Sequence, residues 1–307
     1  MLRIALCFPG QGSQTPGMAA GLDGTDLGGR LRAVAAAAGV DLAPAWGGDD
    51  DAALRRTEIA QPALVLTEMV LAAALPSRLD VVVVAGHSVG EFAACAAAGA
   101  LAPEDALRLV IERSRLMAAM TQGTMAAVLG LDAVELARLC ERVDGTVVVA
   151  NLNAPGQVVI SGTEDAVAAA GDLARTAGAR RVVPLRVGGA FHSPLMADAA
   201  AAFARAMDAA PLRAPRVPVV TNVGADPVTD VEILRDRMRR QMGSPVQWEA
   251  SVRRMVEMGV QALVEVGPGA VLTGLARRAA PGIPALCVDS LSAAADLAGR
   301  LAAEGGE

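Results

Sequence analysis

The sequence predicts a mixed α/β fold in which a core with a parallel sheet is interrupted by a smaller antiparallel unit. Two apolar runs, 2–8 and 79–85, have the continuous hydrophobicity of strands that are buried on both faces of a parallel sheet. Segment 124–190 carries its strands and helices in the order βαββαβ, which is the split unit of ferredoxin-like folds. We therefore expect a large subdomain, made of 1–123 and 191–307, around a small ferredoxin-like one.

The elements before the insertion are bounded by residues that break regular structure. Pro9 and Gly10 end the first strand, Pro76 and Gly99 end helices, and Pro103 suits the first turn of the next helix. The expected elements are a strand at 2–8, a helix at 59–75, a strand at 79–85, and helices at 89–98 and 103–119.

The insertion shows its own start and stop signals. Asp132 with Glu135 and, later, Thr163 are placed to cap two helices. The sequence NAPG separates two strands, so Asn151 and Asn153 are interpreted as hairpin residues rather than catalytic groups. The expected strands are 124–130, 146–150, 157–161 and 180–187, and the expected helices are 132–143 and 163–177.

After the insertion the pattern of the large subdomain resumes. The chain alternates again between short apolar runs and longer amphipathic segments, and it ends in an alanine-rich, acidic stretch. The expected elements are a strand at 217–221, helices at 230–242 and 248–258, a strand at 261–266 and a last helix after about residue 293.

Composition excludes several classes of function. The net charge of −6 argues against nucleic acid as a partner. No apolar run reaches the ~18 residues of a membrane span, and the N-terminus lacks a signal-peptide pattern. Four scattered cysteines and two histidines predict neither disulfides nor a metal site. All 27 basic residues are arginine, so lysine chemistry is absent. We expect a cytoplasmic protein.

Ser88 is the candidate nucleophile. The sequence GHSVG, residues 86–90, fits G-x-S-x-G, a pattern that chance produces roughly 0.1 times in a chain of this composition. It follows an expected buried strand and opens a helix, which is the setting of a nucleophile elbow. The helix N-terminus also supplies N–H groups to an oxyanion. The alternative is a glycine turn with an inert serine.

His192 is the candidate base. A serine hydroxyl needs a base, and the chain offers only two imidazoles. His87 is adjacent to Ser88, and neighbouring side chains leave an elbow in different directions. His192 lies where the insertion returns to the core, so its loop can bring an imidazole beside the elbow. The alternative role for His192 is packing at the end of a loop.

Eight motifs appear in order along the chain: FPGQGSQ (8–14), AQPAL (60–64), GHSVGE (86–91), RSRLM (113–117), NAPGQVVISG (153–162), GAFHSPLM (189–196), PVQW (245–248) and EVGPGAVLTGL (265–275). Together they resemble malonyl-CoA:acyl carrier protein transacylases and the acyltransferase domains of polyketide synthases, over about residues 4–278. This resemblance implies an α/β-hydrolase-like core with a ferredoxin-like insertion.

The resemblance also implies roles at the reacting centre. Ser88 is expected to carry the acyl group, with His192 as its general base. The backbone N–H groups of Gln11 and Val89 are expected to form the oxyanion hole. Gln247, through its carbonyl or its side-chain amide, is expected to orient His192.

Arg113 is the residue that the resemblance places in the acyl pocket. Its planar guanidinium can bind the free carboxylate of a malonyl group in bidentate fashion. If Arg115 were the true match, Arg113 would be an ordinary helix arginine. Gln61 and Met117 are expected to line the same pocket. Phe191 resembles the malonyl-selective pattern of the family.

The expected activity is transfer of malonyl from coenzyme A, through Ser88, to the phosphopantetheine thiol of an acyl carrier protein. No metal or other cofactor is expected, and the protein is expected to be a monomer. Candidate arginines for docking the acidic carrier are Arg180, Arg181, Arg277 and Arg278. The alternatives are an acyltransferase for another acyl group, a carrier-protein hydrolase, and a non-catalytic carrier-binding module.

Overall fold

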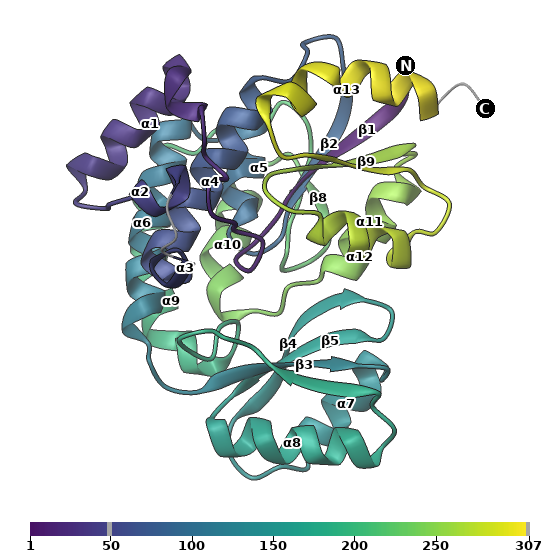
Figure 1. Cartoon of the computed structure of the whole chain (residues 1–307). Coiled ribbons are helices and arrows are strands. Elements are labelled where there is room, and N and C mark those ends of the chain that lie inside the picture. The colour runs from purple at the N-terminus through teal and green to yellow at the C-terminus, as the bar shows by residue number, and fades with distance from the viewer. Residues whose placement is uncertain (48–50, 305–307) are drawn as a thin grey trace.

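A six-stranded sheet forms the centre of the large subdomain in the computed structural model, which describes residues 1–47 and 51–304 (Figure 1). Its strand order is β10–β9–β1–β2–β7–β8, and the pairings are parallel except for that of β7 with β8. The strands are β1 (Arg3–Phe8), β2 (Asp80–Gly86), β7 (Val219–Val220), β8 (Pro227–Val228), β9 (Ala262–Val266) and β10 (Ala285–Val288).

Helices cover both faces of this sheet, as the two apolar runs predict. Alternate side chains of β1 point to opposite sides: Leu6 and Phe8 pack with α4 (Thr57–Ala73) and α5 (Gly90–Ala97), whereas Cys7 packs against the opposite layer. That second layer consists of α11 (Trp248–Glu257) and α12 (Val271–Ala279).

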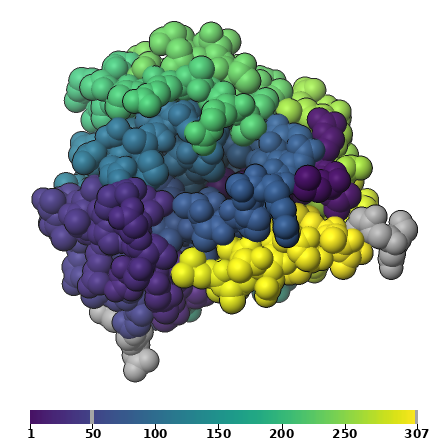
Figure 2. All heavy atoms as spheres, turned by 90° about the horizontal axis from the view of Figure 1, so that it is seen from above, coloured from purple at the N-terminus to yellow at the C-terminus, as the bar shows by residue number. Residues whose placement is uncertain are grey.

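The remaining helices of the large subdomain complete the first layer. The last helix, α13, runs beside the beginning of β1 (Figures 1 and 2). Among the described residues, no helix has both the length and the hydrophobicity needed to cross a membrane. These helices are α1 (Asp26–Ala37), α2 (Ala43–Trp46), α3 (Asp51–Leu54), α6 (Pro103–Ala119), α9 (Ala197–Ala209), α10 (Val231–Arg240) and α13 (Leu291–Glu304).

Several elements carry no clear signal in the sequence. Helix α1 contains Gly28 and Gly29, which lower its intrinsic helix propensity. Thr25 caps it by accepting the Gly28 N–H, and Leu31 and Ala35 bury its inner face. Tertiary packing therefore decides this helix, and the same holds for α9, α12 and β10, which the sequence analysis did not assign.

The insertion forms a four-stranded antiparallel sheet with two helices, which confirms the ferredoxin-like unit. Its strand order is β4–β5–β3–β6, and all six elements lie inside 124–190. The elements are β3 (Thr124–Leu129), α7 (Ala133–Cys140), β4 (Val147–Ala154), β5 (Gln157–Gly162), α8 (Glu164–Thr176) and β6 (Arg181–Pro184).

Two local expectations for the insertion are wrong. Asn151 and Asn153 lie within β4 and not in the hairpin turn, because the strand continues to Ala154. Thr163 stands at the N-terminus of α8 but makes no side-chain capping bond, whereas Asp132 accepts backbone N–H groups of α7 as predicted.

The two subdomains are joined by backbone pairing beside the site. The Leu152 N–H donates to the Val246 carbonyl at 2.9 Å, and the Val246 N–H donates to the Ala150 carbonyl at 2.8 Å. Strand β4 therefore aligns with the segment that precedes α11. This seam brings the asparagines of β4 to the carboxyl ends of the central strands.

Candidate active site

Ser88 sits at a sharp turn between β2 and α5. Its φ angle of +51° lies in the left-handed region, which a non-glycine residue rarely adopts. The glycines on either side are required by close contacts. A Cβ added at Gly86 would lie 2.1 Å from the Gly90 carbonyl carbon, and one at Gly90 would lie 2.2 Å from the Phe8 carbonyl oxygen. The turn therefore has the geometry of a nucleophile elbow.

Two side-chain amides hold the strained residue at both of its backbone groups. The Ser88 N–H donates to Asn222 Oδ1 at 2.6 Å, and the Ser88 carbonyl accepts from Gln241 Nε2 at 2.8 Å. Both amides are buried, at 1% exposure. These bonds offset the cost of the left-handed conformation and leave the hydroxyl free for chemistry.

His192 lies beside the serine hydroxyl. Its Nε2 is 2.7 Å from Ser88 Oγ. Its Nδ1 is 3.1 Å from the carbonyl oxygen of Gln241 and 3.0 Å from that of Ser244. Two carbonyl acceptors require a proton on Nδ1, so in the neutral ring Nε2 is the acceptor that faces the hydroxyl.

The expectation that Gln247 orients His192 is wrong. The groups that orient the imidazole are the backbone carbonyls of Gln241 and Ser244, three to six residues earlier. The Gln247 N–H instead donates to the Asn222 carbonyl at 3.0 Å, which ties the start of α11 to the segment after β7.

Both histidines are neutral near neutral pH. Burial, together with the nearby positive charge of Arg113, lowers the pKa of His192 to about 3. Burial also lowers the pKa of His87, whose Nε2 lies 2.9 Å from Asn153 Oδ1. His192 can therefore accept a proton, whereas His87 is engaged with β4 and has no contact with the Ser88 hydroxyl among the described hydrogen bonds.

Arg113 is fully buried and reaches the nucleophile. Its Nη2 donates to Ser88 Oγ at 3.1 Å and to Gln241 Oε1 at 3.0 Å, and its Nη1 donates to Gln61 Oε1 at 2.6 Å. Burial lowers the pKa of Arg113 to about 10, so it stays charged at neutral pH. Arg115 lies on the surface and binds the Ala38 carbonyl, so the structure favours Arg113 over the alternative.

One donor of the Arg113 guanidinium, its Nε–H group, is not used within the described chain. Its Nε is buried and has no hydrogen-bond partner within 1–47 and 51–304. An unpaired buried donor is costly, and a carboxylate that entered the pocket would satisfy it.

The backbone N–H groups of Gln11 and Val89, which the sequence nominates for an oxyanion hole, donate no hydrogen bond within the described residues. In the elbow, the N–H groups of Ser88, Gly90 and Glu91 are already used. The hydrogen bonds of the described residues include none from the N–H of Val89 or of Gln11. The Gln11 side chain is fixed separately, since its Oε1 accepts from Gln61 Nε2 at 3.2 Å.

Ser88, His192, Gln11 and Gln61 line one cavity of about 210 Å³ between the two subdomains. Arg113 is fully buried and reaches this cavity through its hydrogen bonds to Ser88 and Gln61. Apolar side chains from both subdomains form the rest of the wall, and both Phe191 and Met117 are among them. The apolar lining residues are Met117, Met125, Val159, Leu185, Val187, Phe191, Val271, Leu272 and Leu275.

Comparison with known proteins agrees with this geometry. Residues 6–302 match the model of the acyl transferase domain family. The chain belongs to this acyltransferase family. The malonyl CoA-acyl carrier protein transacylase of Bacillus subtilis strain 168 is 40% identical over 287 residues, which are 91% of this chain and 90% of that protein.

Solved structures of similar proteins support the same assignment for this acyltransferase. The malonyl CoA-acyl carrier protein transacylase of Coxiella burnetii superposes with a TM-score of 0.92 at 31% identity, covering 98% of both chains. A malonyl-transacylase solved in complex with a type II polyketide synthase acyl-carrier protein gives a TM-score of 0.89 at 34% identity, covering 96% of this acyltransferase and 98% of that chain.

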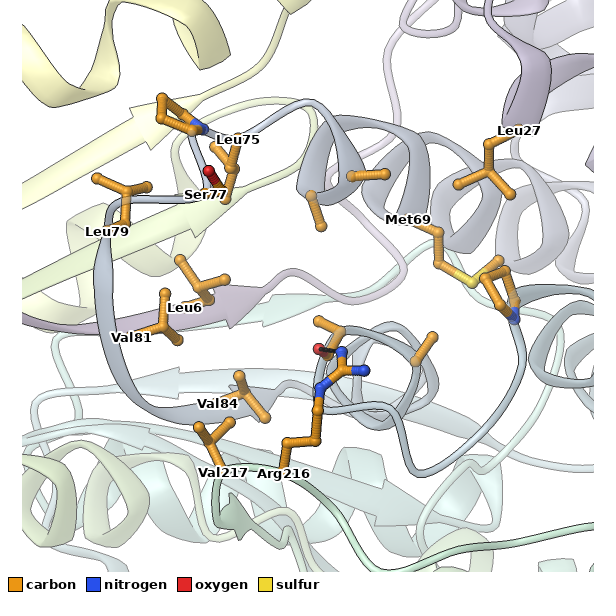
Figure 3. A pocket seen from close by; sticks show the side chains of 16 residues that line it. Leu6, Leu27, Met69, Leu75, Ser77, Leu79, Val81, Val84, Arg216 and Val217 are labelled. Atoms are coloured by element: carbon orange, nitrogen blue, oxygen red, sulfur yellow. Dashed lines mark hydrogen bonds between the residues drawn. The ribbon is translucent and has the colours of Figure 1, made fainter.

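A second hollow lies near the other end of the sheet and differs chemically from the active site (Figure 3). It has a volume of about 470 Å³ and is lined mainly by apolar side chains such as Leu6, Met69 and Val84, with Arg216 at its edge. Its lining residues include no pair of nucleophile and base. Within the described part of the acyltransferase, no group of three or more histidine, cysteine or acidic residues could hold a metal ion.

Sequence reasoning missed the residues that hold Ser88 and His192 in place, which are Asn222, Gln241 and Ser244. They stand in loops or at a helix end, and none belongs to a motif that has a recognised chemical role. The one available signal for Gln241 is its position, four residues before the start of the PVQW motif.

Proposed function

We propose that this acyltransferase moves a malonyl group from coenzyme A to the phosphopantetheine thiol of an acyl carrier protein, in fatty acid or polyketide biosynthesis. The observation that carries the proposal is the position of Ser88 Oγ, which lies 2.7 Å from His192 Nε2 and 3.1 Å from Arg113 Nη2. A nucleophile, its base and a buried cation thus meet at one atom.

In the first half-reaction, Ser88 Oγ attacks the thioester carbonyl while His192 Nε2 takes the hydroxyl proton. The carbonyl oxygen becomes an oxyanion, and we assign its stabilisation to the N–H groups of Gln11 and Val89. The C–S bond then breaks, and His192 returns the proton to the departing thiolate of coenzyme A. The products are malonyl-Ser88 and free coenzyme A.

Arg113 supplies selectivity for an acyl group that ends in a carboxylate. Before substrate binds, Arg113 donates to the Ser88 hydroxyl. A malonyl carboxylate can take over these donors and the unpaired Nε, which frees the hydroxyl for attack. The carboxylate also offsets the positive charge that contributes to the low pKa of His192, so binding makes the base stronger.

In the second half-reaction, the carrier thiol takes the place of coenzyme A. His192 accepts the thiol proton, the sulfur attacks the Ser88 ester, and the proton passes back to Ser88 Oγ when the C–O bond breaks. We propose that the reaction needs no further cofactor, because each step is a proton transfer or an acyl transfer between these groups. We place the reaction in the cytoplasm, as the composition predicts.

The carrier protein would approach the mouth of the cavity between α12 and the small subdomain. The four arginines nominated for docking are all exposed, and none forms a salt bridge with an acid within the described residues. Arg277 and Arg278 lie on α12, which lines the cavity with Leu272 and Leu275. Arg278 also donates to Gln157 Oε1 and to the Pro155 carbonyl, which joins α12 to the small subdomain. Exposed cations without an acidic partner suit an acidic carrier.

Intact-mass spectrometry tests the proposal directly. The wild type mixed with malonyl-CoA should gain one malonyl group, and Ser88→Ala should gain none. Addition of phosphopantetheinylated carrier protein should move the label from enzyme to carrier. An adduct on Cys7 or Cys95, or rapid release of free malonate in place of transfer, would contradict it.

A further inference from the structure

Glu91 is a buried acid for which the reaction described above has no use. It lies in the first turn of α5, three residues after the nucleophile, and it is 1% exposed. Both of its carboxylate oxygens are hydrogen-bonded. Oε1 accepts the Asn222 N–H at 3.2 Å, and Oε2 accepts a short bond from Gln241 Nε2.

The two partners of Glu91 are the residues that hold Ser88. Asn222 Oδ1 accepts the Ser88 N–H, and Gln241 Nε2 donates its other hydrogen to the Ser88 carbonyl. Gln241 also accepts from Arg113 Nη2 through Oε1 and from His192 Nδ1 through its backbone carbonyl. One carboxylate is therefore separated by a single residue from the nucleophile, the base and the substrate cation.

Glu91 is also the nearby negative charge that acts on Arg113. The guanidinium forms no salt bridge with any acid in the described chain, although it is fully buried. Its interaction with Glu91 is favourable and opposes the effect of burial. Gln241 stands between the two charges, because its amide accepts from Arg113 and donates to Glu91.

We propose that Glu91 is a positioning residue and the buried counter-ion of Arg113, and that it acts on both catalysis and malonyl affinity through the side chain of Gln241. This inference rests on the proposed function. As a positioning residue, Glu91 fixes the amide that holds Ser88 and places the carbonyl that orients His192. As a counter-ion, it limits the positive charge that Arg113 presents to the malonyl carboxylate.

The charge of the Glu91 carboxyl group is expected to change with pH near neutrality. Burial raises its pKa to about 7, against the lowering effects of Gln241, Asn222 and Arg113. The ionisable groups that face it are Arg113 from α6 and Cys95 from its own helix. As pH rises, Glu91 ionises and its negative charge compensates the positive charge of Arg113. The attraction between Arg113 and the malonyl carboxylate then weakens. Acetyl-CoA carries the same coenzyme without the carboxylate and serves as reference.

The test compares Glu91→Gln with Glu91→Asp in steady-state transfer from malonyl-CoA and acetyl-CoA. Glu91→Gln removes the charge and places an amide against an amide, so kcat should fall on the order of 10- to 100-fold for both substrates. Its KM for malonyl-CoA, relative to acetyl-CoA, should fall several-fold and lose its dependence on pH between about 6 and 8.5. The exposed Glu112→Gln on α6 is the control, and it should behave as the wild type.

Glu91→Asp separates the two roles. The shorter acid keeps the charge but cannot reach both partners, so kcat should fall while the pH dependence of the KM ratio remains. If Glu91→Gln and Glu112→Gln behave alike, the inference is overturned, although malonyl loading of the wild type still stands. If Glu91→Gln does not fold, the wild type decides: a malonyl-to-acetyl KM ratio that stays constant across this pH range refutes the counter-ion role.

Discussion

Two buried glutamates of the large subdomain have opposite surroundings. Glu91, beside the nucleophile, has both oxygens hydrogen-bonded and a buried cation nearby. Glu68, in the middle of α4, is 0% exposed, and neither of its oxygens has a hydrogen-bond partner in the described part of the chain. Burial of a polar group therefore does not by itself indicate function. In the active-site region, by contrast, the buried polar groups are joined to one another by hydrogen bonds.

The neighbourhood of Glu68 explains the difference. Its nearest charged influence is Glu265, which raises the Glu68 pKa further above the value that burial alone would produce. Glu265 is itself satisfied, because it accepts the N–H groups of Leu272 and Thr273 at the start of α12. Burial and the neighbouring Glu265 therefore both favour the protonated form of Glu68.

We expect the largest effect in the hydrogen-bonded active-site region from removal of the proposed base, His192. His192→Ala should lower malonyl transfer on the order of 10⁴-fold, because a nucleophile and its base act as a unit. His87→Ala should cost far less, since its contact is with Asn153 and not with Ser88 Oγ. Single-turnover acylation rates of both variants measure this. Equal losses would mean that the base is misassigned.

Arg113→Ala should have the next largest effect, and it should depend on the substrate. Loss of one partner from a buried charge pair costs about 2–5 kcal/mol, so kcat/KM for malonyl-CoA should fall roughly 30- to several-thousand-fold. Transfer from acetyl-CoA should hold or rise, because no carboxylate is left unpaired.

Two further variants control the Arg113 experiment. Arg113→Lys should restore activity only in part, since a point charge cannot reproduce the planar fork that reaches Gln61, Ser88 and Gln241. Arg115→Ala, on the surface of the same helix, should change neither substrate. If Arg113→Ala reduces transfer of both acyl groups equally, Arg113 supports the fold of the site and does not select the substrate.

The side chains that meet at Ser88 Oγ were predictable from sequence and resemblance, whereas the groups that hold them in place were not. Ser88 is marked by glycines that the elbow's close contacts require. Arg113 and His192 belong to motifs with recognisable spacing. Gln241 and Asn222 each hold the Ser88 backbone with one side-chain amide. Both are far from Ser88 in the sequence, and only the folded chain brings them to the elbow. The mistaken choice of Gln247 has the same origin: a backbone carbonyl orients His192, and any residue type can supply a carbonyl.

The fold follows a similar division. Strands β1 and β2 are readable because both faces are buried, which makes the apolar run continuous. The order βαββαβ identifies the small subdomain even though single signals fail: Asp132 caps α7 as predicted, whereas Thr163 makes no side-chain capping bond. Helix α1 has two glycines and forms because Leu31 and Ala35 find partners in the core, which local sequence does not report.

Asn222→Ala tests the support of the elbow, with a smaller expected effect. The substitution removes the acceptor of the Ser88 N–H and allows the left-handed residue to relax, so kcat should fall roughly 10- to 100-fold with little change in KM. Gln247→Ala is the matched comparison, because only its backbone N–H contacts this region. A loss in Gln247→Ala as large as that in Asn222→Ala would restore the role first predicted for Gln247.

The last prediction concerns Glu68, and it is an effect on the free energy of unfolding rather than on activity. The folded protein keeps Glu68 protonated well above its ordinary pKa of 4.5, whereas the unfolded chain releases the proton near that value. Stability from this group is therefore fully present below pH 4.5 and falls as pH rises toward the raised pKa, by up to about 1.4 kcal/mol per pH unit. Glu68→Met keeps the volume but removes the carboxyl group, so its stability relative to the wild type should rise from about pH 5 to about pH 8, by no more than ~1.4 kcal/mol per pH unit. Urea unfolding at both pH values measures the gap, with Glu112→Gln as the exposed control. A gap that does not change with pH would show that Glu68 is ionised or partnered in the folded protein, and the contrast with Glu91 would then disappear.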